Sequence, residues 1–143
     1  MANLTDYAEN KFIDHLFRAA TFTKPTTLYI ALFTAAPTDA GGGTEVTGGS
    51  YARQALNPSD TNWYATQGGT TGASSGTGGA TSNVPEISFP QASANWGTVV
   101  AAAIMESVSG GNMILWGNLT ASKVINSGDQ FRFATGNLSV TLQ

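Results

Sequence analysis

The sequence predicts a mainly β protein, an antiparallel sandwich or barrel-like domain of about seven strands with one N-terminal helix. Three observations support this class. Short apolar runs alternate with turn residues from residue 26 onward, and helical spacing of apolar residues is confined to the N-terminus. The length of 143 residues suits one domain with a single core. We therefore expect a single β-rich domain over residues 1–143.

The predicted helix covers about residues 4–20. Its apolar residues recur at steps of three and four: Leu4, Tyr7, Ala8, Phe12, Leu16 and Ala19 or Ala20. Asn3 or Thr5 can serve as the N-cap. Pro25 closes the segment because proline biases the preceding residue away from helical geometry. One face of this helix is apolar and needs something to cover.

Seven short β runs follow, separated by turn residues. They are residues 28–34, 50–56, 85–89, 98–106, 113–116, 130–134 and 138–142. The last two alternate between apolar and polar residues, so each has one buried and one wet face. Residues 99–104 are apolar on both parities, which predicts a strand buried on both sides or one at a subunit contact. Hairpin-type turns favour an antiparallel meander over residues 98–143.

A low-complexity stretch of Gly, Thr, Ser and Ala fills residues 65–83, inside a segment of about 62–83 that interrupts the β runs. No core can be built from this composition. The stretch is either a flexible surface loop or an arm that orders against a neighbouring subunit.

Charged residues make up only 10% of the chain, against roughly 25% in typical soluble domains. A neutral polar surface favours assembly, because the centres of protein interfaces are depleted of charge. The net charge is −3 and the six Lys and Arg residues are scattered, so we expect no nucleic-acid partner. The longest apolar run, residues 99–105, is too short to span a bilayer, and the N-terminus lacks a secretory pattern. We therefore expect no membrane partner and folding in the cytoplasm.

Motifs for catalysis and metal binding are missing from the sequence. The only histidine, His15, lies in the predicted helix without a visible triad partner. The acids show no facing carboxylate pair, and there is no cysteine, EF-hand or phosphate-binding loop. Asp129 is expected to bond to the backbone of its own turn, with calcium ligation as the alternative. We expect no enzyme, no catalytic residues, no cofactor and no metal.

Three residues are candidates for binding a partner: Trp63, Tyr64 and Arg53. Trp63 and Tyr64 border the glycine-rich stretch, where an exposed aromatic pair could stack on a sugar ring or on a neighbouring subunit. Arg53 is a charge inside a β run, and a structural ion pair or an edge position is the alternative to a partner contact. Trp96 and Trp116 are expected to pack in the core or against glycine backbone.

Three phrases of the sequence join apolar runs to Gly, Pro or Asn and so specify bends and core anchors. They comprise residues 26–34 with 43–54, residues 87–90 with 94–99, and residues 110–123 with 128–129. In this combination the chain resembles a family of small bacteriophage virion proteins, often labelled tail-fibre proteins. Similar small β-rich proteins serve as capsid decoration, or cement, proteins. The chain departs from the family at Ala101–Ala103, where larger residues are expected, and at the insertion of residues 62–83.

The resemblance implies a structural protein of the virion. The first hypothesis is a capsid decoration (cement) protein that binds and stabilises the assembled shell. Its partners would be the major capsid protein and further copies of itself, in a homotrimer. The alternative is a tail-fibre or receptor-binding domain that recognises host surface glycan, for which Trp63 and Tyr64 are the sequence support. Other virion roles, such as tail tube or connector, remain open beside these two.

Overall fold

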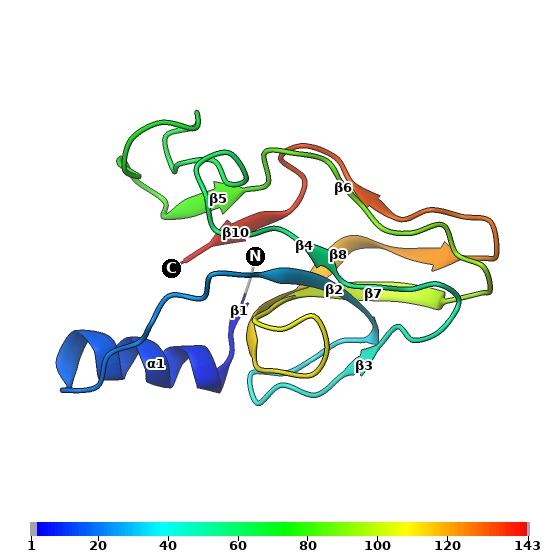
Figure 1. Cartoon of the computed structure of the whole chain (residues 1–143), viewed down its shortest axis with the longest axis horizontal. Coiled ribbons are helices and arrows are strands. Elements are labelled where there is room, and N and C mark those ends of the chain that lie inside the picture. The colour runs from blue at the N-terminus through cyan, green and yellow to red at the C-terminus, as the bar shows by residue number, and fades with distance from the viewer. Residues whose placement is uncertain (1–2, 143) are drawn as a thin grey trace.

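The computed structural model describes residues 3–142, and its largest element is a six-stranded antiparallel sheet (Figure 1). The order is β1-β8-β7-β2-β3, and β4 also pairs with β2. The strands of this sheet are β1 (Asn3–Leu4), β2 (Tyr29–Ala35), β3 (Thr44–Glu45), β4 (Gln54–Ala55), β7 (Gly97–Met105) and β8 (Met113–Ile125). β7 therefore lies in the centre, between β2 and β8.

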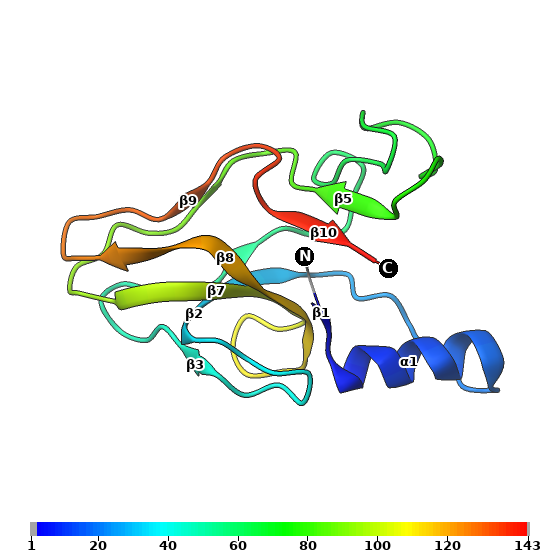
Figure 2. The same ribbon diagram turned by 180° about the vertical axis from the view of Figure 1, so that it is seen from behind.

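Two short antiparallel ribbons form a second layer (Figures 1 and 2). One pairs β5 (Ala80–Ser82) with β10 (Ser139–Thr141), and the other pairs β6 (Ile87–Ser88) with β9 (Arg132–Phe133). Side chains from both layers share one core, among them Ile30, Leu32, Ile87, Phe89, Val99, Phe131, Phe133 and Val140. The predicted mainly β, sandwich-like class is confirmed. The strand number is ten among residues 3–142, because several strands are only two residues long.

An aromatic column runs through this core. The ring of Phe89, which is fully buried, stacks on Tyr51 at a centroid distance of 6.1 Å and meets Phe131 edge-on at 5.8 Å. Phe131 in turn meets Phe133 at 5.0 Å. Stacked and edge-to-face pairs of this kind stabilise a core beyond the area they bury. The column therefore ties the loops around Tyr51 and Phe89 to the second layer.

The predicted two-sided burial of the run at residues 99–104 is confirmed in β7. Val99 and Ile104 face the main core. Ala101, Ala103 and Met105 contribute to a second cluster on the opposite face of the sheet. Strands covered on both faces lose the alternation of polar and apolar residues, which is why the sequence shows a continuous apolar run here.

The predicted meander over residues 98–143 is wrong beyond β8. β7 and β8 do form an antiparallel pair, but β8 runs on to Ile125 instead of ending near Trp116, and β9 and β10 pair with β6 and β5. Alternation in a sequence indicates which face of a strand is buried, and it does not indicate which strand lies alongside.

The helix, α1, spans Asp6–Phe17 and is shorter than the predicted residues 4–20. Thr5 is its N-cap, and the Thr5 hydroxyl accepts a hydrogen bond from the Ala8 N–H. Arg18 ends the helix in an extended conformation. No helix among the described residues is long and apolar enough to cross a membrane.

The glycine-rich insertion is an exposed loop over most of its length and part of the fold at its end. Residues 71–79 are exposed, whereas β5 pairs with β10. Asn83 is fully buried: its Nδ2 donates to the carbonyls of Pro85 (2.8 Å) and Ala134 (3.0 Å), and its Oδ1 accepts from the Leu138 N–H (2.8 Å). None of residues 65–83 belongs to a hydrophobic core cluster, and the buried residue among them is the polar Asn83.

Candidate interaction surface

The guanidinium of Arg53 is held entirely by groups of its own chain. Its Nε and Nη2 donate to the two carboxylate oxygens of Glu45, each at 2.7 Å, and its Nη1 donates to the carbonyls of Ser107 (2.6 Å) and Gly110 (2.8 Å). The side chain is only 6% exposed. Hydrogen bonding to Glu45 raises the pKa of Arg53, with burial opposing it. Arg53 thus ties β3 to the loop between β7 and β8, as a two-pronged ion pair does.

Trp63 and Tyr64 lie where the chain enters the glycine-rich insertion, and both side chains are half-buried. The Trp63 indole N–H donates to the carbonyl of Leu56 at 3.3 Å, and its ring packs against the main core. The backbone of Tyr64 is fixed by bonds to Ser82 and Thr81. Both residues line a shallow hollow of about 290 Å³ beside the insertion. The structure brings these two together, while Arg53 bonds to a different part of the sheet.

Tyr51 is the most strongly perturbed ionisable group. Its hydroxyl donates to Glu45 Oε1 at 3.0 Å and accepts from the Leu32 N–H at 2.9 Å. Burial, assisted by the Glu45 charge, raises the pKa of Tyr51 far above 10, although the bond from Leu32 acts in the opposite direction. Together with Arg53, this phenol belongs to a structural network that holds β2 and β3.

The remaining candidates for chemistry are used locally. His15 Nδ1 accepts a hydrogen bond from the Phe22 N–H at 3.2 Å, on the surface. Asp129 Oδ2 accepts from the Asn126 N–H at 2.9 Å, which confirms its predicted role in the turn. Within residues 3–142, no three His, Cys, Asp or Glu side chains gather in a way that could hold a metal ion.

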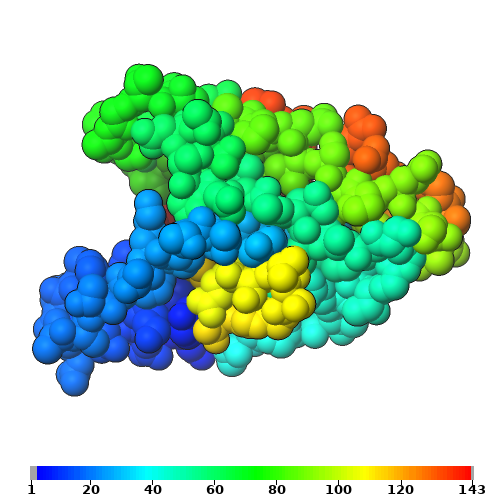
Figure 3. Space-filling view, in the orientation of Figure 1, coloured from blue at the N-terminus to red at the C-terminus, as the bar shows by residue number. Residues whose placement is uncertain are grey.

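The most distinctive surface feature is the outward face of α1. The helix projects from one end of the β body (Figures 1 and 3), and Ala8 is its only buried residue. Four large apolar side chains are exposed on it: Phe12 (42%), Ile13 (49%), Leu16 (63%) and Phe17 (81%). Their spacing places them on one side of a helix. Of the apolar face predicted from the sequence, Ala8 is buried, whereas Phe12 and Leu16 are exposed. Ile13 and Phe17, which the predicted face did not include, are exposed beside them.

Acidic residues continue this outward face toward the start of the helix. Glu9 precedes Phe12 by three residues and Ile13 by four, so its side chain lies on the same side. Lys11, by contrast, turns toward the ring of Tyr7 at 5.6 Å, and Arg18 pairs with Asp14 at 3.3 Å. The outward face of α1 is therefore apolar with an acidic margin.

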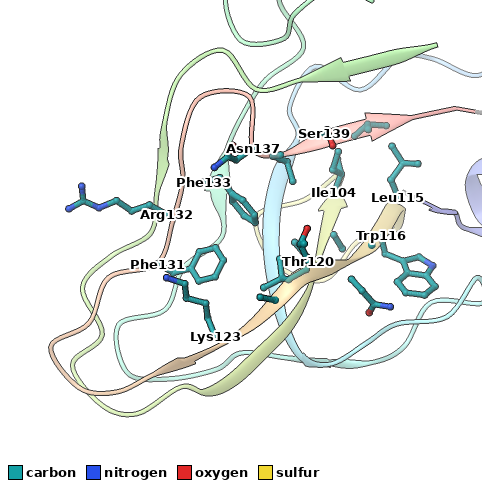
Figure 4. A pocket seen from close by; sticks show the side chains of 18 residues that line it. Ile104, Leu115, Trp116, Thr120, Lys123, Phe131, Arg132, Phe133, Asn137 and Ser139 are labelled. Carbon is teal, nitrogen blue, oxygen red and sulfur yellow. The ribbon is translucent and has the colours of Figure 1, made fainter. Parts of the chain in front are cut away.

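A groove lies between β8 and the segment that carries β9 and β10 (Figure 4). Its volume is about 440 Å³. Apolar side chains from both layers line it, including Ile104, Leu115, Phe131, Phe133 and Leu138. The charged residues of its lining are Lys123 and Arg132, both basic. Sequence reasoning missed this groove, because it depends on how far the second layer covers the first.

The chain is similar to structural fibre proteins of bacteriophages, and this class suits a small β domain with exposed contact surfaces. The family model described as podophage GP4 fiber I protein gp80 matches residues 3–141. Because the match covers nearly the whole chain, the protein belongs to this family. The resemblance to small phage virion proteins is thereby confirmed. No curated protein matches the sequence.

Proposed function

We propose that this protein is a non-enzymatic fibre component of the phage particle that attaches to other virion proteins through surface contacts. The observation that carries this proposal is the outward face of α1, which exposes four large apolar side chains at the projecting end of an otherwise packed domain. Exposed apolar patches on small proteins are typical of contact sites. The family description, a fibre protein, supports the same assignment.

The ionisable groups with perturbed pKa values support a structural role. Arg53 and Tyr51 both bond to Glu45, and they also bond to backbone groups of the loop between β7 and β8 and of β2, respectively. Networks of this kind perturb pKa values without serving catalysis. The low charge of the chain, 10% of residues, suits a surface that contacts neighbouring proteins over large areas.

Location in the particle separates the fibre assignment from capsid decoration, which the sequence favoured. Quantitative mass spectrometry of purified particles gives the copy number. A small number of copies at the tail or at discrete fibres supports our proposal, whereas hundreds of copies spread over the shell support decoration and binding to the major capsid protein. Particles that lack the protein altogether would contradict both.

The attachment surface is tested by Leu16→Glu. Leu16 is exposed, so this substitution leaves the fold intact and places a charge in the apolar face. We expect the variant to be lost from particles when it is supplied in place of the wild-type protein. Ser122→Glu, at an exposed position of β8, is the matched control and should be incorporated normally. Normal incorporation of Leu16→Glu would refute attachment through α1.

Recognition of host glycan is a second candidate, favoured by the hollow beside the insertion. Trp63, Tyr64 and Asp60 line it, a combination of aromatic rings and a carboxylate that suits sugar hydroxyls and ring faces. Tyr64→Ala is the informative variant, because the bonds that fix Tyr64 use its backbone. If glycan binding occurs here, this variant loses adsorption of the particle to host cells; unchanged adsorption rejects the candidate.

A further inference from the structure

Two surfaces of this chain remain without a partner in the described residues, and they are opposite in shape. The outward face of α1 is a convex apolar ridge. The space between β8 and the β9–β10 segment is a groove of mixed lining, with apolar residues such as Leu115 and Leu138 beside polar ones such as Asn118 and Thr120. The ridge cannot reach the groove of its own chain, because the first turn of α1 is fixed on the edge of the sheet. Thr5 N–H donates to the Ile114 carbonyl at 3.1 Å, and Asp6 N–H donates to the Asp39 carbonyl at 2.8 Å.

The two surfaces also have opposite charge. The outward face of α1 carries Glu9 beside its apolar residues, whereas the charged groups that line the groove are Lys123 and Arg132. Lys123 forms no ion pair with any described residue, while Arg132 lies 3.5 Å from Glu86. An amphipathic helix, which presents apolar residues and charges on one side, suits a groove whose lining is partly apolar and carries the opposite charge.

β8 has a bulge in its pairing with β7 beside the groove. Val99 pairs with Lys123, but two residues later Ala101 pairs with Asn118, so β8 has extra residues between these pairs. Bulges of this kind bend a strand and re-aim its side chains. The bulged segment, with Thr120 and Lys123 at the groove in Figure 4, forms one wall of it.

We propose that α1 of one copy binds in the groove of a second copy of this chain, with the apolar side chains of the helix in the groove and Glu9 near Lys123. The inference rests on the proposed function and names a partner for its attachment surface. A ridge on one copy and a groove on the next form a head-to-tail contact, which closes into a ring or continues as a filament. A ring of three would be the homotrimer that the resemblance implies.

Sedimentation velocity of the purified protein tests self-association directly. We expect the wild type to associate in a concentration-dependent way with an affinity on the order of micromolar. Leu16→Glu, in the ridge, and Lys123→Glu, at the groove, should each weaken association by about tenfold or more. Ser122→Glu, on the same strand, is the control and should associate like the wild type. A wild type that stays monomeric at high concentration would overturn the inference.

Mixing two variants distinguishes a head-to-tail contact from a symmetric one. Leu16→Glu keeps an intact groove, and Lys123→Glu keeps an intact ridge. In an equimolar mixture each pair has one intact contact, so we expect heterodimers and nothing larger. A mixture that stays monomeric, or one that forms the wild-type assembly, contradicts the geometry proposed here.

A charge exchange tests the pairing of Glu9 with Lys123. Glu9→Lys and Lys123→Glu should each weaken association, and the double variant should recover most of it, because the opposite charges then face each other again. Association of the double variant no stronger than that of the single variants would reject this pairing. Because these measurements use the isolated protein, they can fail while Leu16 still proves necessary for incorporation into particles, which would leave the proposed function standing with a different partner.

Discussion

The β body buries its large apolar residues, whereas α1 exposes them. In the body, Phe89, Ile30 and Leu32 are completely buried, and aromatic rings stack across the two layers. In α1, Phe17 is 81% exposed and only Ala8 is buried. Burial stabilises the body at roughly 25 cal/mol per Å² of apolar surface, whereas the same kind of surface on α1 gives the isolated chain nothing. The contrast separates a body that is stabilised by apolar burial from a helix whose outward apolar face adds nothing to the stability of the isolated chain.

Phe89→Ala should give the largest effect, because it removes the centre of the aromatic column. We expect a loss of about 4 kcal/mol in the free energy of unfolding, the usual cost of truncating a buried aromatic ring. Urea denaturation followed by tryptophan fluorescence measures it. A loss of unfolding free energy below about 1 kcal/mol would mean that the aromatic column is not the core of the body.

Arg53→Ala comes next, because it leaves Glu45 without its partner and frees two carbonyls of the loop between β7 and β8. We expect a loss of about 3 kcal/mol, the range for breaking one side of a buried ion pair. Arg53→Lys should restore only part of it, because a lysine cannot make the same fork of bonds. Full rescue by lysine would show that charge alone matters at this position.

Tyr51→Phe should change how stability depends on pH. The buried phenol of Tyr51 keeps its proton in the folded chain above pH 10, because burial raises its pKa, whereas the unfolded chain loses that proton near its ordinary value of 10.0. The unfolded state then binds fewer protons than the folded state, so stability falls as the pH rises above 10. Denaturation midpoints at a series of pH values from neutral to alkaline should fall more steeply for the wild type than for Tyr51→Phe. Parallel curves would contradict the raised pKa.

Leu16→Glu should give the smallest effect on stability, although it is the key variant for association. Leu16 is 63% exposed, so the expected change in the free energy of unfolding of the monomer is within about 0.5 kcal/mol. Leu32→Glu is the counterpart in the body: it buries a charge at a fully enclosed position and should prevent folding. A large destabilisation by Leu16→Glu at low protein concentration would mean that α1 is covered, against the contrast drawn above.

The β elements were predictable where apolar residues mark their burial. The run at residues 99–104 has no polar face in the sequence, and β7 is buried on both sides as expected. β8 was expected to end near Trp116 because the residues after it are mostly polar. It continues to Ile125 by pairing with β7, and this part of β8 is largely exposed, so it needs no apolar face that the sequence would show.

The candidate surface was predictable in part. The spacing of Phe12 and Leu16 predicts an apolar helix face, but the sequence cannot show that the body leaves this face uncovered, since that depends on where the first turn of α1 is fixed. Asn83 could not be recognised either, because it ends a stretch of low complexity and its three side-chain bonds are to backbone groups distant in sequence or set by a local turn. The groove at β8 likewise arises from layer packing, which local patterns do not record.

The N-cap of α1 has a consequence for binding. Thr5 is buried, and its hydroxyl donates to the Met113 carbonyl while it also accepts from Ala8 at the start of the helix. The cap thus fixes the direction in which the helix leaves the sheet. A helix on a flexible linker would lose orientational freedom when it binds a partner, and that loss of entropy would weaken the complex. Because Thr5 fixes α1 during folding, a partner that binds the helix as we propose would meet it already oriented, and this loss would not weaken the complex.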